Sequence, residues 1–138
     1  MIYTHSWLLV IVAAIVSFAV GWIWYGPLFG KLWMRLSGIQ MGNPQDPNAK
    51  KMMMRSIVFG LAAQILTSFI FFTVALSTVA ITFSSLAVLA LWVTIGFQVP
   101  ILVGDVLWQQ KPWPLFLLNA CYQFVNLLVI AFVFTFTM

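Results

Sequence analysis

Charge is the scarcest property of this sequence. Asp, Glu, Lys and Arg together make up 6% of its 138 residues, whereas hydrophobic residues make up 64%. A soluble globular domain carries about 25% charged residues, because its surface must face water. The composition therefore excludes a soluble domain and indicates a chain that lies mostly in a membrane.

Acidic, histidine and cysteine side chains are also nearly absent. The chain has two acids, Asp46 and Asp105, one histidine, His5, and one cysteine, Cys121. General acid–base catalysis has few possible groups here, and no nucleotide-binding or zinc-protease motif occurs, so we predict that the protein is not an enzyme. His5 has no Cys, Asp or Glu nearby, so we expect no metal site and no cofactor. A lone histidine still leaves haem or pigment binding open as an alternative.

Long uncharged runs provide the membrane segments. A spanning helix needs about 20 mostly apolar residues. The 49 residues between Arg55 and Asp105 carry no charge, which is too long for one span and suits two spans joined by a turn near residues 76–85. The predicted spans are about 7–25, 54–76, 84–106 and 114–136, within one membrane domain that covers residues 1–138.

The positions of the six cations predict the orientation of the chain. Five lie between the first two spans, and the sixth, Lys111, lies between the last two, so with four spans both groups face the same side. Cytoplasmic loops carry an excess of Lys and Arg, so we expect an inner (plasma) membrane protein with cytoplasmic basic loops and both termini outside. The net charge of +4 is too small and too clustered to suggest nucleic acid as a partner. We expect anionic lipid headgroups instead, at Lys31, Arg35, Lys50, Lys51 and Arg55.

The stretch GWIWYGPLFGKLWMRLSG, residues 21–38, ends the first span. Gly26 before Pro27 predicts a helix break, because a residue that precedes proline disfavours the α conformation. Pro27 suits the start of a short amphipathic helix over about 27–37, which Gly38 can end before a loop over about 38–51. We expect this helix to lie in the membrane interface, and a direct ligand or substrate role is the alternative. The candidate residues of the motif are Trp22, Trp24, Tyr25, Gly26, Pro27, Lys31, Trp33 and Arg35.

The segment WYGPLFGKLWMRLSG resembles the signature of a bacterial membrane family known only as domain of unknown function number seventeen-sixty-one. Gly96, the stretch Trp108 to Pro112, Asn119 and Tyr122 are also similar to later parts of that family. The resemblance covers nearly the whole chain. It implies a small four-span fold with this motif after the first helix, and it implies no reaction.

Polar and small residues recur at helical spacing in the predicted spans. Side chains three, four or seven positions apart share one face of a helix, and polar side chains are costly inside a membrane. The candidate polar faces hold Gln64, Ser68, Thr94, Gln98, Asp105, Asn119, Tyr122, Gln123 and Asn126. Small residues that allow close helix packing are Ala13, Ser17, Gly21, Ser56 and Gly60.

Two interpretations of the polar faces remain open. Amides and hydroxyls can bond across helices and hold a bundle or an oligomer together, or they can line a pathway for a small solute or ion. Asp105 lies near the end of the third span, where we expect an interfacial carboxylate paired with Lys111 or with a cation of the first loop.

The sequence as a whole predicts an all-α integral membrane four-helix bundle with a short amphipathic interfacial helix after the first span. The predicted function is a small membrane scaffold or accessory protein that packs, through its small and polar faces, with itself or with a larger membrane complex. The alternative is an oligomeric channel or carrier for a small solute or ion. A third interpretation is a cofactor- or pigment-binding membrane subunit.

Overall fold

The computed structural model describes residues 2–39, 43 and 45–136, with side chains from Trp7 onward. The prediction for His5 therefore lies outside the described side chains. The described chain is helical and contains no strand, which confirms the all-α fold class. Its elements are α1 (Ile2–Ile23), η1 (Trp24–Leu28), α2 (Gly30–Ser37), α3 (Pro47–Ser77), α4 (Phe83–Val93), η2 (Thr94–Gln98), α5 (Val99–Trp108) and α6 (Trp113–Thr135).

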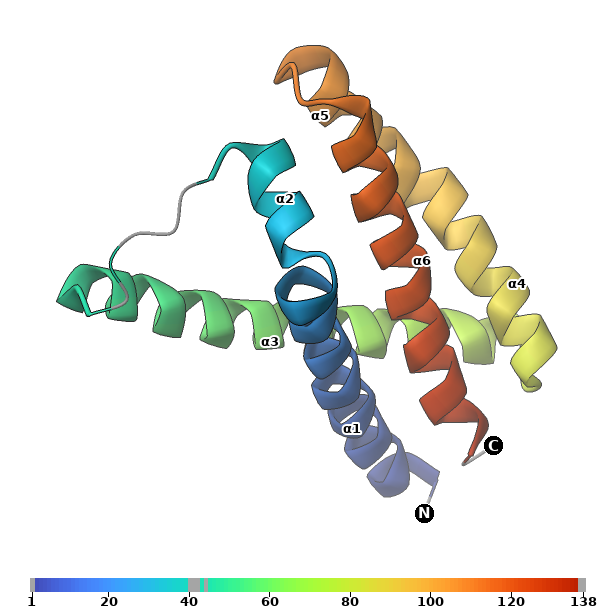
Figure 1. Cartoon of the computed structure of the whole chain (residues 1–138). Coiled ribbons are helices and arrows are strands. Elements are labelled where there is room, and N and C mark those ends of the chain that lie inside the picture. The colour runs from blue at the N-terminus through green and yellow to red at the C-terminus, as the bar shows by residue number, and fades with distance from the viewer. Residues whose placement is uncertain (1, 40–42, 44, 137–138) are drawn as a thin grey trace.

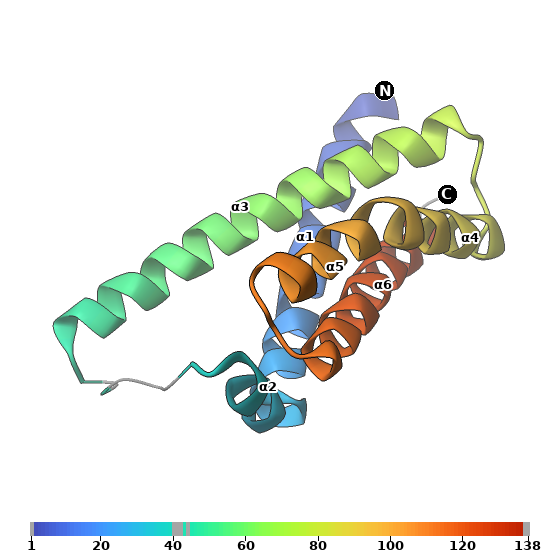
Figure 2. The same cartoon turned by 90° about the horizontal axis from the view of Figure 1, so that it is seen from above.

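Four segments of the described chain are long and apolar enough to cross a membrane. They are Trp7–Leu28, Pro47–Ser77, Phe83–Trp108 and Trp113–Thr135. α1, α6 and the α4–α5 segment run side by side, whereas α3 crosses them at a wide angle (Figures 1 and 2). The start of α1 and the end of α6 lie at one end of this assembly, and α2 and the α5–α6 turn lie at the other (Figure 1).

α3 is the longest helix of the described chain, and its start is well capped. The Asp46 carboxylate accepts a hydrogen bond of 3.0 Å from the Asn48 backbone N–H, and Pro47 occupies the first helical turn, where its missing N–H costs little. The helix begins earlier than the predicted span, so residues 47–51, which we assigned to the loop, are helical. Its 31 residues reach about 46 Å, well beyond the roughly 30 Å of membrane hydrocarbon, and a steep tilt accommodates such an excess.

The third span runs as one helical segment over Phe83–Trp108, as the sequence predicts, but it contains a π-helical turn. Pro100 has no N–H to donate to the Gly96 carbonyl. The backbone hydrogen bonds before it therefore change from the α-helical to the π-helical pattern of η2. The Val99 N–H bonds to the Thr94 carbonyl, five residues back. α4 itself begins with a capping box between Thr82 and Ser85, in which each side chain bonds the other's backbone N–H.

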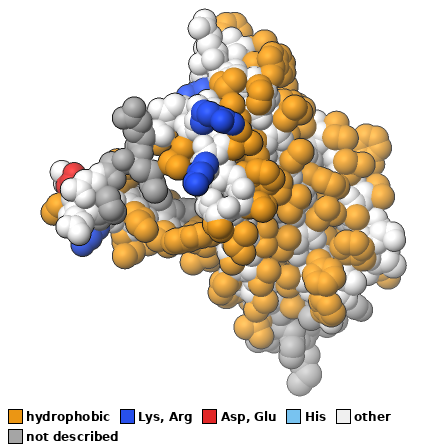
Figure 3. All heavy atoms as spheres, viewed as in Figure 1, with side chains coloured by type: hydrophobic (Ala, Val, Ile, Leu, Met, Phe, Trp, Pro, Cys, Tyr) orange, Lys and Arg blue, Asp and Glu red, His pale blue; other side chains and the backbone are white. Residues whose placement is uncertain are grey.

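A single apolar core ties the helices together near the chain termini. Phe134 of α6 packs against Phe71 and Phe72 of α3, and Val10 and Leu86 from α1 and α4 complete the cluster. Most of the remaining visible surface is apolar, and the Lys and Arg side chains gather around α2 and the start of α3 (Figure 3). That distribution suits a chain whose flanks face lipid.

Candidate functional site

The motif after the first span forms a sharp kink between α1 and α2. Gly26 takes φ −112° and ψ −105°, which lie outside the helical region, so the predicted break at Gly26–Pro27 is confirmed. The Phe29 N–H then bonds the Trp24 carbonyl at 2.9 Å across the kink. The chain leaves α1 here and enters α2 in a new direction.

Tyr25 occupies the centre of this kink. Its hydroxyl donates a 2.7 Å hydrogen bond to Asn119 Oδ1 on α6. Its ring lies edge-on to Tyr122 and to Trp33, with centroids 4.9 Å and 5.8 Å away. Trp24, its neighbour, packs on Phe29 with centroids 4.7 Å apart. The motif therefore joins α1, α2 and α6 through one polar bond and a set of aromatic contacts.

Gly30 allows α2 to begin this close to the kink. It is buried, and a Cβ at this position would lie 2.9 Å from the Tyr25 carbonyl oxygen. At the other end of α2, Gly38 has φ 73° and returns its N–H to the Met34 carbonyl, as the sequence predicts for a helix end. Both ends of this short helix thus depend on glycine.

The outer side of the kink is a shallow groove with two cations. We call it the basic groove; its lining residues are Gly26, Pro27, Leu28, Lys31, Leu32 and Arg35. Lys31 and Arg35 are exposed, and Trp22 is more than half exposed at the end of α1. The motif thus combines a face that packs within the chain with a face open to its surroundings.

A second set of polar contacts centres on Gln64 of α3. Its Oε1 accepts hydrogen bonds from Ser17 Oγ (3.2 Å) and from Asn126 Nδ2 (3.3 Å). Its Nε2 donates to the Tyr122 hydroxyl at 3.3 Å. Tyr122 also touches Tyr25, so the two sets are continuous. We call them together the polar cluster: Ser17, Tyr25, Gln64, Asn119, Tyr122 and Asn126.

The small residues of α1 make room for this cluster. A Cβ at Gly21 would lie 2.5 Å from the Tyr122 hydroxyl oxygen, so only glycine allows this tyrosine so close to α1. Ala13 and Ser17 are fully buried on the same helix. On α3, Gly60 faces the Phe18 ring, whereas Ser56 is exposed and bonds only the Met52 carbonyl of its own helix.

Five of the predicted polar residues lie outside the cluster. Ser68 is buried and its hydroxyl has no partner among the described residues, and buried Thr94 bonds the Ala90 carbonyl one turn back. Gln98 and Gln123 are partly buried and no described side chain bonds them. Among the described residues Asp105 forms no ion pair, contrary to the expected pairing with Lys111 or a first-loop cation. Its Oδ1 accepts a 3.1 Å hydrogen bond from Gln109, one turn later on the same helix.

Comparison with protein families decides where this chain belongs. A family model described as "Protein of unknown function (DUF1761)" matches residues 8–135. The chain is a member of this family. No curated protein and no solved structure matches it.

The DUF1761 family is described only as being of unknown function, so membership assigns no chemistry to this site. Among the described residues, no group of three or more His, Cys, Asp or Glu side chains could hold a metal ion. The polar cluster provides hydrogen-bond donors and acceptors that join α1, α3 and α6, and the exposed basic groove lies beside it. Sequence reasoning did not predict the Tyr25–Asn119 bond, since 94 positions separate the two residues. It also missed Gln109, although the i, i+4 spacing from Asp105 is a usable signal.

Proposed function

We propose that this protein is a non-catalytic scaffold or accessory subunit of the inner (plasma) membrane that assembles with a second copy of itself. The observation that carries the proposal is the first part of α3, residues 47–59, which we call the α3 arm. The arm runs out beyond the other spans (Figures 1 and 2). Its apolar side chains stay uncovered, with Met52 71% and Phe59 68% exposed.

Apolar exposure alone requires no protein partner inside a lipid bilayer. The arm differs from an ordinary lipid-facing surface because polar and apolar side chains share one open hollow along it. The hollow is lined by Asn48, Lys51, Met52, Arg55, Ser56 and Phe59. A mixed surface on a rigid helix suits a neighbouring helix near the membrane interface, where both kinds of side chain find partners.

The faces that the sequence offers for self-assembly are largely used within the chain. Ala13 and Ser17 are fully buried, Gly21 faces Tyr122, and Gly60 faces Phe18. These four small residues hold α1, α3 and α6 together, so the faces that carry them are not available to a second copy. The scaffold proposal therefore rests on the arm.

Cysteine cross-linking in native membranes tests this proposal. The variants Met52→Cys, Ser56→Cys and Phe59→Cys are made in a Cys121→Ser background and oxidised. Trp92→Cys and Ile101→Cys are matched controls, since both side chains are also exposed in spans. Cross-linked dimers at arm positions alone support self-assembly through the arm. A monomeric mass in mild detergent, with no arm cross-links, contradicts it, and links to a larger protein alone favour an accessory subunit.

The proposed topology places the basic loops in the cytoplasm and both termini outside. The positions of the cations support this topology, because Lys and Arg are more frequent in cytoplasmic loops than in loops on the other side of the membrane. Gln45 is exposed just before the start of α3, and Ser84 is exposed in the first turn of α4, which follows the other end of α3. A membrane-impermeant maleimide should leave Gln45→Cys unlabelled in intact cells and label Ser84→Cys. The reverse labelling pattern would invert the topology.

A second candidate function is a carrier or channel for a small solute. The observation in its favour is that Asn119 belongs to the polar cluster and also lines a pocket at the α2 end of the molecule. Polar groups therefore continue from that pocket into the span region. Solute flux into liposomes that contain the purified protein tests this candidate, and flux equal to that of empty liposomes rules it out.

A further inference from the structure

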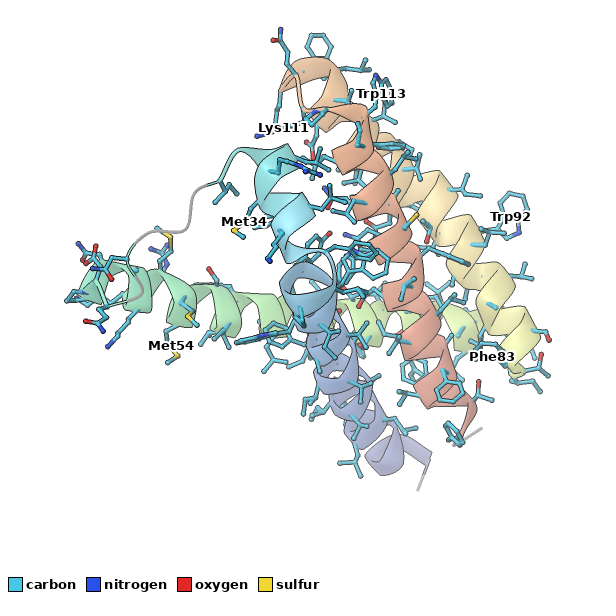
Figure 4. All side chains as sticks on the ribbon, viewed as in Figure 1. Met34, Met54, Phe83, Trp92, Lys111 and Trp113 are labelled. Carbon is cyan, nitrogen blue, oxygen red and sulfur yellow. The ribbon has the colours of Figure 1, made fainter. Side chains whose placement is uncertain are left out.

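A small pocket opens where the end of α2 approaches the α5–α6 turn. Its volume is about 200 Å³, and it is formed by α2, α5, α6 and the residues that follow α2 and α5. Lys111 extends from the turn on the side that faces α2 (Figure 4). We call it the polar pocket; its polar lining residues are Ser37, Asp105, Gln109, Lys111 and Asn119. Apolar walls come from Ile39, Leu102, Val106, Leu115 and Phe116.

The pocket holds one carboxylate and one ammonium group that do not neutralise each other. Asp105 and Lys111 both line it, yet the described side chains form no ion pair between them. One oxygen of Asp105 accepts from the Gln109 amide, and no described side chain bonds the other. Opposite charges held apart across a partly enclosed space leave each charge incompletely compensated.

The neutral polar residues Ser37 and Asn119 also line this pocket. The Ser37 hydroxyl is buried and has no hydrogen-bond partner among the described residues. Asn119 directs its Oδ1 to the Tyr25 hydroxyl, which fixes the amide plane and leaves its NH₂ group for other acceptors. A buried hydroxyl without a partner in a native fold calls for an explanation, and a bound acceptor provides one.

From this arrangement we infer that the polar pocket binds a small zwitterion, a molecule with one ammonium and one carboxylate group, such as a small amino acid. Asp105 accepts from the ligand ammonium, and Lys111 and Ser37 donate to the ligand carboxylate. A water molecule occupies about 30 Å³ in the liquid, so the pocket holds only a molecule of a few heavy atoms. The inference goes beyond the scaffold proposal and does not depend on it.

The charge of the site selects this class over simple ions. A lone cation would be attracted by Asp105 and repelled by Lys111. A lone anion would be attracted by Lys111 and repelled by Asp105. A zwitterion of matching separation is attracted by both groups, and charge-assisted hydrogen bonds are about twice as strong as neutral ones. The ligand should therefore lose affinity when either of its charges is removed.

Binding to the purified full-length protein tests the inference. Glycine, β-alanine, L-alanine and L-serine are the probes, and ethylamine and acetate each carry only one of the two charges. Thermal unfolding and calorimetry measure binding up to probe concentrations of about 10 mM, which detects dissociation constants near 1 mM. At least one zwitterion should raise the unfolding temperature and bind measurably, and neither ethylamine nor acetate should do so.

Variants then locate the binding. Asp105→Asn and Lys111→Gln should each weaken binding of the zwitterion by at least about tenfold. Asp46→Asn and Lys50→Gln make the same charge changes at exposed positions outside the pocket, and should leave binding unchanged. Gel filtration and circular dichroism confirm that each variant folds. Absence of binding by every zwitterion, equal binding of the singly charged probes, or binding unaffected by both pocket variants overturns the inference.

Discussion

The hydroxyl of Tyr25 donates a 2.7 Å hydrogen bond to Asn119 Oδ1, although 94 positions separate the two residues in the chain. This bond joins the kink after the first span to the last span. It also links the polar cluster with the polar pocket, because Asn119 belongs to both. The most distinctive motif of the sequence thus has a structural task that its position at a membrane exit does not suggest.

Removing this hydroxyl should destabilise the protein. In Tyr25→Phe, the ring contacts with Tyr122 and Trp33 remain, but the Asn119 acceptor loses its donor. Hydrogen bonds between membrane helices are worth about 0.6 kcal/mol on average and up to about 1.7, so we expect a loss in this range. Reversible unfolding in mixed micelles measures it, and a double-mutant cycle with Asn119→Leu isolates the pair. A coupling energy of zero would contradict the bond.

Gly21→Ala should disturb the packing of α1 on α6. The added methyl would approach the Tyr122 hydroxyl oxygen to 2.5 Å, so the tyrosine or the helix must shift. Overpacking of this kind costs about 1–3 kcal/mol, measured by the same unfolding experiment. Tyr122→Phe removes the oxygen and should partly rescue the variant. Gly104→Ala is the control, since nothing lies within 4 Å of its new Cβ, and an equal loss there would refute the steric explanation.

Gln64→Leu should lower the free energy of unfolding more than a substitution at any other residue of the polar cluster. Its amide bonds Ser17, Tyr122 and Asn126, so three partners on two helices lose a bond at once. A buried group left without its partner costs about 1–3 kcal/mol. Gln123→Leu is the matched control, because no described side chain bonds that amide. The proposal of a stabilising cluster fails if the two variants unfold alike.

Charge at the basic groove should govern affinity for anionic lipid. Lys31 and Arg35 are exposed along α2, and each cation near an anionic surface is worth about 1 kcal/mol at low salt. The double variant Lys31→Gln and Arg35→Gln should bind fewer anionic lipids, as measured by native mass spectrometry from nanodiscs. The difference should shrink at high salt, since the interaction is screened. Nanodiscs of zwitterionic lipid provide the control, and an equal change there would exclude a headgroup effect.

Much of the architecture follows from the sequence because it depends on local rules. Long uncharged runs can only be buried in lipid or in protein, so the four spans are predictable from length and composition. The kink at Gly26–Pro27 and the helix end at Gly38 follow from backbone preferences of glycine and proline. The candidate polar residues could likewise be placed on helix faces from their spacing alone.

The tertiary structure alone decided which of those faces meet. Spacing places Gln64 and Gln123 equally well on polar faces. In the structure, Gln64 forms hydrogen bonds to side chains of α1 and α6, whereas no described side chain bonds Gln123. The wide angle at which α3 crosses the other spans also depends on how the helices pack. The sequence by itself determined the membrane spans and the motif that ends the first one, because hydrophobicity and backbone conformation act locally. The partners of each polar side chain were decided by packing between segments far apart in the chain, and local rules carry no information about that packing.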